Sequence, residues 1–227
     1  MRFTMFPGKG QPPALTNELK ELVVLTYGAI EAANVERWAL AFGAAAPPVL
    51  PGTMRVSSYE TDVVGTIHRL GQRYWERRGE AAVWERPFPT GEQGRPKAVD
   101  IALFDTTGQR ETRIEFGLYT KNNAGHATKK KLEDDAEKLA GLVGTVAPGY
   151  PNVENYIVLW HEMRGASVKM TNARRLAIRK AFRTHAETIT AAAVHNVDLL
   201  LMSAGPLFPD RDGEHHWAAV GLFKVTI

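Results

Sequence analysis

The spacing of the hydrophobic residues changes at Gly79, and this change restricts the possible folds more than any other feature of the sequence. Before Gly79 the apolar residues recur near a period of 3.6, which predicts two helices, from about Glu18 to Ala46 and from about Ser58 to Arg78. After Gly79 short apolar runs lie between turn residues, a pattern that is typical of strands. Long helices are therefore expected to precede a region that forms a sheet.

The region after Gly79 alternates between predicted strands and predicted helices. The turn Asp105-Thr106-Thr107-Gly108 joins two of the strands into a hairpin. This order of elements predicts an α/β fold in which helices flank a mixed sheet, rather than an all-parallel sheet. The predicted strands cover 81–88, 99–104, 111–119, 155–160, 197–202 and 217–225, and the predicted helices cover about 128–142 and 172–188.

The N-terminal part contains two further features. Residues 1–15, with two glycines and a Pro-Pro pair, are predicted to form an irregular arm. Within the first predicted helix, Gly28 and Asn34 are positions where the helix could bend or split into two.

The composition excludes several kinds of site. The 227 residues contain no cysteine, which excludes disulfides, thiolate zinc sites, iron–sulfur clusters and a cysteine nucleophile. The apolar runs are far shorter than the ~18 residues of a membrane span, and the N-terminus has no apolar signal-peptide core. We therefore expect a soluble cytoplasmic protein without a membrane partner. The net charge of +3 permits an anionic partner but does not by itself indicate one.

Two acidic residues lie in neighbouring predicted strands. Asp100 opens the strand 99–104, and Glu115 lies inside the strand that pairs with it. Because side chains alternate along a strand, Glu115, Gly117 and Lys121 share one face, and the hairpin could bring both carboxylates to the same edge of the sheet. Converging carboxylates repel each other, and a divalent cation relieves the repulsion. Mg²⁺ is held by one or two carboxylates together with water and phosphate oxygens.

At these residues the chain resembles the PD-(D/E)XK nuclease superfamily, whose core is a helix, a three-strand meander, a helix and a further strand. The segment from Ser58 to Trp160 has this order of elements. The resemblance implies a restriction-endonuclease-like α/β domain over residues 54–227, with its core at about 58–160. An arm and a helical extension would occupy residues 1–53, and a helix with further strands would follow the core.

The resemblance also implies metal ligands and an activity. Asp100 and Glu115 would hold Mg²⁺ or Mn²⁺, and Glu60 or Glu76 of the preceding helix could supply a third acid. The implied activity is metal-dependent hydrolysis of DNA phosphodiester bonds, of the restriction, defence or repair type. A two-fold dimer would suit the cutting of both strands.

The lysine of the family motif is missing from its usual position, which is occupied by Gly117. Lys121, on the same strand face, is the predicted replacement that assists the attacking water. A lysine of the following helix could replace it instead, and the candidates are Lys130, Lys131 and Lys138.

Two groups of basic residues are candidates for contacts with nucleic acid. Lys129, Lys130 and Lys131 stand near the start of a predicted helix, where cations oppose the helix dipole, and this placement hints at a phosphate. The other group lies on the helix after Thr171, at spacings that place several side chains on one face. Its members are Arg174, Arg175, Arg179 and Arg183. A solvated face is the alternative interpretation of both groups.

Other interpretations of the acidic pair stay open on sequence alone. Asp100 could be an ordinary strand-entry residue, and Glu115 could pair with Arg113 or Lys97. Gly117 favours a catalytically inactive module of the same fold that binds nucleic acid or protein. A third possibility is an unrelated α/β enzyme that acts on a small phosphorylated ligand in a closed pocket.

Overall fold

The computed structural model describes residues 4–7, 17–42, 60–88, 97–119, 124–142, 150–164, 171–192, 195–207 and 216–226. The helices and strands follow one another in the order predicted from the sequence, with one additional strand at the N-terminus. The elements are β1 (Thr4–Pro7), α1 (Asn17–Phe42), α2 (Glu60–Arg77), β2 (Glu80–Phe88), β3 (Lys97–Asp105), β4 (Arg110–Tyr119), α3 (Ala124–Gly141), β5 (Asn152–Arg164), α4 (Asn172–Ala192), β6 (Asn196–Pro206) and β7 (His216–Thr226).

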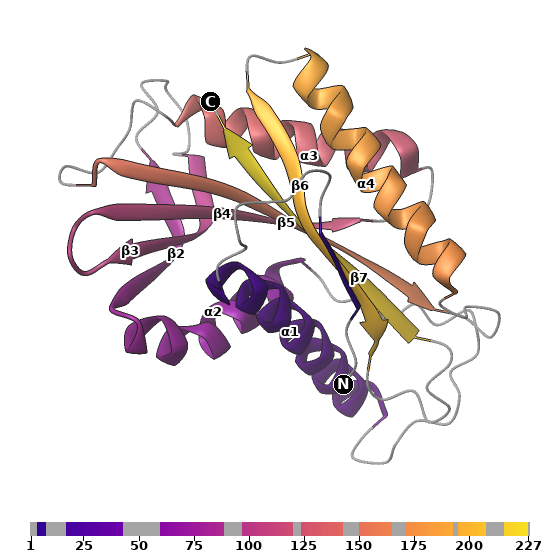
Figure 1. Cartoon of the computed structure of the whole chain (residues 1–227). Coiled ribbons are helices and arrows are strands. Elements are labelled where there is room, and N and C mark those ends of the chain that lie inside the picture. The colour runs from indigo at the N-terminus through magenta and orange to yellow at the C-terminus, as the bar shows by residue number, and fades with distance from the viewer. Residues whose placement is uncertain are drawn as a thin grey trace.

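The strands form one mixed sheet in the order β1-β6-β7-β5-β4-β3-β2. β4 and β5 are parallel, and every other neighbouring pair is antiparallel. A parallel pair needs a long crossover connection, and the crossover from β4 to β5 contains α3. Helices α1 and α2 cover one face of the sheet and α3 and α4 the other (Figure 1). The prediction of a mixed sheet flanked by helices is confirmed.

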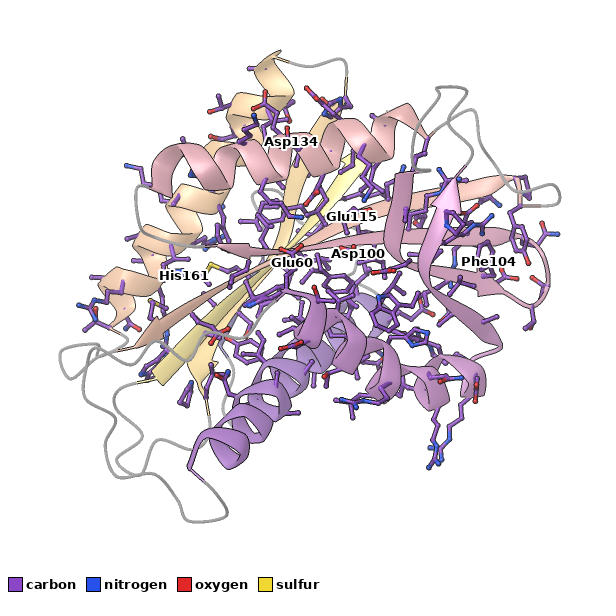
Figure 2. The ribbon with its side chains drawn as sticks, turned by 180° about the vertical axis from the view of Figure 1, so that it is seen from behind. Glu60, Asp100, Phe104, Glu115, Asp134 and His161 are labelled. Atoms are coloured by element: carbon purple, nitrogen blue, oxygen red, sulfur yellow. The ribbon has the colours of Figure 1, made fainter. Side chains whose placement is uncertain are left out.

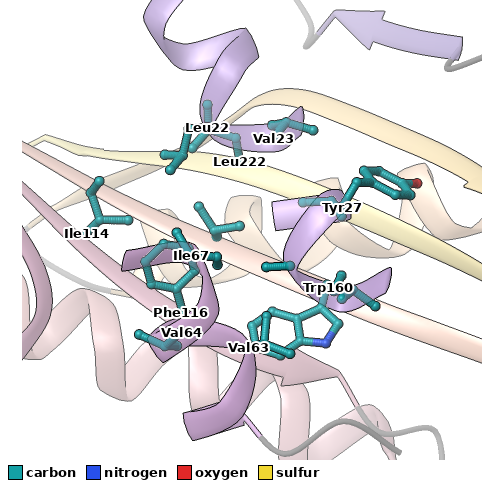
Figure 3. Close-up of a cluster of buried hydrophobic side chains, with 14 of the residues drawn as sticks. Leu22, Val23, Tyr27, Val63, Val64, Ile67, Ile114, Phe116, Trp160 and Leu222 are labelled. Carbon is teal, nitrogen blue, oxygen red and sulfur yellow. The ribbon is translucent and has the colours of Figure 1, made fainter. Parts of the chain in front are cut away.

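Each face of the sheet carries its own hydrophobic core. On the α1/α2 face, Tyr27, Ile67, Phe116 and Trp160 are fully buried in one cluster (Figure 3). On the other face, Leu132, Leu139 and further residues of α3 and α4 pack against β5, β6 and β7. The alternation along β4 places Ile114 and Phe116 in the first core. Glu115 and Gly117 consequently face α3.

One prediction about the N-terminal region is wrong, and the structure excludes a split of the first helix, one of two possibilities that the sequence left open. Thr4–Pro7 lies within the predicted irregular arm but forms strand β1, which pairs antiparallel with β6. Helix α1 is continuous across Gly28 and Asn34. The Asn34 side chain donates to the Ile30 carbonyl oxygen at 2.8 Å and to Glu162 Oε2 at 3.3 Å, so its amide bonds without interrupting the helix. Among the described residues, no helix is both long and apolar enough to cross a membrane.

The turn between β3 and β4 agrees with its sequence. Asp105 Oδ1 accepts the Thr107 N–H at 2.7 Å, and the Gly108 N–H donates to the Asp105 carbonyl oxygen at 3.0 Å. Gly108 has a φ of 73°, a conformation in which glycine carries no steric penalty. This turn sets the register that places Ile101 opposite Ile114.

Two positions on α2 test the buried face of that helix. Ile67 is completely buried, whereas Leu70 is 49% exposed. We expect Ile67→Ala to lower the free energy of unfolding by about 2–5 kcal/mol, because it removes buried methyl groups and leaves a cavity. Leu70→Ala, the matched control, should change it by less than about 0.5 kcal/mol. Urea unfolding of both variants measures the difference, and equal losses would contradict this packing of α2.

Candidate functional site

The site begins where the main-chain pairing between β3 and β4 stops. The paired residues run from Phe104 opposite Glu111 to Ile101 opposite Ile114, and one further step along this register brings Asp100 level with Glu115. There a side chain replaces the main chain as the acceptor. Asp100 Oδ2 accepts the N–H of Phe116 at 2.8 Å. The unpaired backbone of β4 thereby fixes the Asp100 carboxylate at the opening between the two strands.

Two residues further along β4, the N–H group of Leu118 is bound by an acid from α2. Glu60, the first residue of α2, accepts the Leu118 N–H through Oε2 at 3.1 Å. Glu60, Asp100 and Glu115 therefore come together from three different elements (Figure 2). Of the two candidates for a third acid, Glu60 lies near Asp100 and Glu115, whereas Glu76 is exposed on α2 and accepts a hydrogen bond from Gln72 Nε2 at 3.2 Å.

Helix α3 contributes one acid and two lysines to the same place. Lys131, Asp135 and Lys138 recur at i, i+4 and i+7 and so share one helix face. Lys131 Nζ lies 3.1 Å from Glu60 Oε1 and 3.4 Å from Asp135 Oδ1. Lys138 Nζ lies 2.6 Å from Glu115 Oε1. We call Glu60, Asp100, Glu115, Asp135, Lys131 and Lys138 the carboxylate–lysine cluster.

The electrostatics of the cluster disfavour negative charge on its buried acids. Burial raises the pKa of Asp100. It also raises the pKa of Glu115 to about 8, where the neighbouring Asp100 carboxylate adds to the effect and Lys138 opposes it. Burial raises the pKa of Asp135 to about 6 against the opposing influence of Lys131 and Lys138. Four carboxylates face only two ammonium groups, so an additional cation would stabilise their ionised forms.

The donor atoms of the cluster suit a hard divalent cation. The atoms of the cluster that could bind a metal ion are carboxylate oxygens, the ligands that Mg²⁺ and Mn²⁺ prefer. One of them, the buried Oδ2 of Asp135, has no hydrogen-bond partner among the described residues. Within the described part of the chain, no three histidine, aspartate or glutamate side chains are grouped so that together they could hold a metal ion. Mg²⁺ requires only one or two protein carboxylates because water and substrate phosphate complete its coordination. Asp100 and Glu115 therefore fit such an ion.

Gly117 makes room for a lysine from α3. A Cβ atom added to Gly117 would lie 2.9 Å from Lys131 Cε and 2.7 Å from Leu159 Cδ2, closer than carbon atoms normally approach. The Lys131 side chain therefore runs across β4 where a larger residue would stand. Of the three helix lysines that the sequence offered as replacements, Lys131 occupies the place next to Gly117. Lys121 lies outside the described residues.

The alternative pairing of Glu115 with Arg113 is wrong. Arg113 is fully buried, and its Nε lies 2.8 Å from Glu111 Oε1. Its Nη1 donates to the Leu142 carbonyl oxygen at 2.8 Å, just beyond the last residue of α3. Glu115 is instead paired with Lys138. Arg113 thus anchors the end of α3 and is paired with Glu111. Glu115 is therefore left to pair within the cluster.

The two lysines of the run 129–131 whose side chains are described lie in different surroundings. The helix begins at Ala124, four residues before its predicted start, so these lysines do not lie at the helix start as we expected. Lys130 is exposed, and the side chain of Lys129 lies outside the described part of the structure. Lys131 is paired with Glu60 and Asp135. Lys130 therefore lies on the surface, whereas Lys131 is half-buried in the cluster.

The arginines of α4 are divided between two environments. Arg174 is exposed, whereas Arg175, Arg179 and Arg183 are half-buried. The Arg175 guanidinium lies 5.7 Å from the centre of the Trp217 ring on β7. Part of the predicted basic stripe therefore faces the sheet, and its exposed end lies on the same side of the sheet as α3.

Sequence reasoning did not identify Asp135 as a member of the site. The signal was present in the spacing of Lys131, Asp135 and Lys138, which places three charged residues on one helix face. On the same helix the buried apolar residues Leu132, Ala136 and Leu139 lie beside that face. Charged residues beside the buried face of a helix are placed to contact partners on the sheet.

Comparison of the chain with known protein families, with curated proteins and with solved structures returned no match.

The close approach at Gly117 can be tested by adding one methyl group. We expect Gly117→Ala to lower the free energy of unfolding by about 1–3 kcal/mol, because the new Cβ overlaps Leu159 and Lys131. Gly28→Ala is the matched control, since a Cβ there meets nothing within 4 Å, and it should stabilise α1 by up to about 1 kcal/mol. Chemical denaturation distinguishes the two, and a neutral Gly117→Ala would show that position 117 has room to spare.

Proposed function

We propose that this chain is a metal-dependent nuclease of the PD-(D/E)XK type that hydrolyses phosphodiester bonds in DNA. The observation that carries the proposal is the convergence of Asp100, Glu115 and Lys131 at the opening between β3 and β4. The order α2-β2-β3-β4-α3-β5 supports a restriction-endonuclease-like fold, since it repeats the helix, three-strand meander, helix and strand of that core.

In this proposal Asp100 and Glu115 hold Mg²⁺ or Mn²⁺. The bound ion would supply an activated water and neutralise negative charge on the phosphoryl group. Asp100 is positioned by the N–H group of Phe116, and Glu115 by its place in the centre of β4, paired with β5. Two acids held by the sheet present their oxygens without a large rearrangement of the backbone.

Lys131 supplies the positive charge that the family motif places on the strand. Burial lowers its pKa, but the ion pairs with Asp135 and Glu60 outweigh this effect and raise the pKa above its usual value. Lys131 therefore keeps its proton at neutral pH. It acts as a cation that orients the attacking water or stabilises charge on the phosphate, and not as a general base.

The proposed substrate class rests on exposed cations of the two helices that cover this face of the sheet. Lys130 and Arg174 are exposed on the helices of the α3/α4 face, where they could contact phosphates along a nucleic-acid backbone. Cleavage of both strands of DNA would favour a two-fold dimer, in which each subunit acts on one strand. The restriction, defence and repair roles share this chemistry.

Removal of either metal ligand tests the proposal. In a plasmid-cleavage assay we expect activity with Mg²⁺ or Mn²⁺ and none with EDTA. Asp100→Asn and Glu115→Gln should each lower the rate at least about a hundredfold, because a charge at the reacting centre is lost. Asp134→Asn is the matched control, since Asp134 is exposed on α3 and should keep the wild-type rate (Figure 2).

Two outcomes of this assay contradict the proposal. Metal-dependent cleavage that survives both substitutions would place the chemistry elsewhere in the chain. Binding of DNA by the wild-type protein without cleavage in any divalent metal would favour the catalytically inactive module on the same fold.

Substitution of two adjacent lysines, Lys130 and Lys131, distinguishes their proposed roles. Lys131→Met should lower kcat by about 10²–10³-fold, because the charge beside the reacting phosphate is lost, while DNA binding stays close to the wild-type value. Lys130→Met removes an exposed charge and should weaken DNA binding slightly without a change in kcat. Single-turnover cleavage and a DNA-binding titration measure the two effects. Equal kcat values for the two variants would contradict the assignment of Lys131.

A further inference from the structure

Lys138 makes the closest charged contact to the proposed metal ligands. Its Nζ lies 2.6 Å from Glu115 Oε1, and Glu115 is only 1% exposed. A carboxylate at this depth is costly to keep ionised without a nearby positive charge. Lys138 also acts favourably on the charge of Asp100. One ammonium group thus serves both acids that the proposed function assigns to the cation.

The two lysines of the cluster are held very differently. Lys131 is bound by two carboxylates, Glu60 and Asp135, on either side of its ammonium. The one ion pair within 4 Å that the described residues give Lys138 is with Glu115, and its side chain is 23% exposed. Glu115 is fixed in β4, where it lies level with Ile157 of β5. In this pair the flexible lysine stem is therefore the partner that can move into solvent.

A divalent cation bound to Glu115 would lie beside the Lys138 ammonium, which is 2.6 Å from Oε1 of the same carboxylate, and like charges repel strongly at such short range. Binding of the ion at Glu115 therefore favours withdrawal of the Lys138 ammonium from this carboxylate. The exposed portion of the Lys138 side chain gives it a route to water that does not disturb the sheet.

We propose that Lys138 is the internal counter-cation of the Asp100–Glu115 pair, and that a divalent cation displaces its ammonium when it binds. The inference rests on the proposed function, which places the cation at these two acids. Lys138 therefore stabilises the metal-free protein and, by the same contact, lowers the affinity of the protein for the cation.

The test compares cation affinity and thermal stability in Lys138→Met, which keeps an unbranched side chain of nearly the same length without its charge. Titration of the metal-free protein with Mg²⁺ or Mn²⁺, followed by calorimetry, should give a Kd about tenfold lower than that of the wild type. The melting temperature in EDTA should fall, and the increase on addition of the cation should exceed that of the wild type. Lys130→Met, the matched control on the same helix, should change neither quantity.

Two further variants keep the test decisive. Lys138→Arg retains the charge and should keep the weaker, wild-type-like affinity for the cation. Lys138→Gln serves in the same titration if the methionine variant does not fold, and the same tightening is expected.

The outcomes separate this inference from the proposed function. If the wild type binds the cation and Asp100→Asn abolishes binding, but neither uncharged variant at position 138 binds more tightly, Lys138 is not the displaced counter-cation and the metal site stands. If the wild type binds no cation, or binds it equally well after Asp100→Asn and Glu115→Gln, both proposals are wrong.

Discussion

The site depends on one structural event, the end of main-chain pairing between β3 and β4. Beyond Ile101 and Ile114, the N–H groups of Phe116 and Leu118 still need acceptors, because buried backbone donors are rarely left unpaired. Asp100 and Glu60 accept these two bonds with their side chains. The unpaired N–H groups of β4 need acceptors, and this need places the carboxylates of Asp100 and Glu60 at the opening between the strands.

The opening also allows helices from the two faces of the sheet to meet. Glu60 belongs to α2, which covers the α1/α2 face, and Lys131 belongs to α3 on the opposite face, yet their charged groups lie 3.1 Å apart. Lys138 ties α3 to the centre of β4 in the same region. Four acids are gathered here with only two lysines, so the arrangement tolerates burial of charge only because each lysine is placed against specific oxygens. The proposed cation would relieve this shortage of positive charge.

The sequence predicted the layers of the fold better than it predicted the contacts of the site. Periodicity identified helices and strands because each buries one face, and the hairpin register brought Asp100 level with Glu115. Strand β1 was missed because four residues next to glycine and proline carry little local preference, and pairing with β6 determines their conformation. The role of Lys131 was open for a similar reason. Periodicity gives the face of α3 but does not show which lysine reaches the space beside Gly117.

In the proposed nuclease site a lysine on α3 takes the place of one on the strand, and this changes what the site depends on. A lysine at position 117 would be held by the same ladder that holds Glu115, so acid and cation would keep their separation whenever the sheet is intact. Lys131 is held instead by the packing of α3, through buried residues such as Leu132 and Ala136, and by the bond from Arg113 to the carbonyl oxygen of Leu142. The buried Arg113–Glu111 pair, which lies outside the cluster, thereby becomes part of what positions it. In this chain the geometry of the proposed reaction centre is set by the docking of a helix as much as by the register of a hairpin.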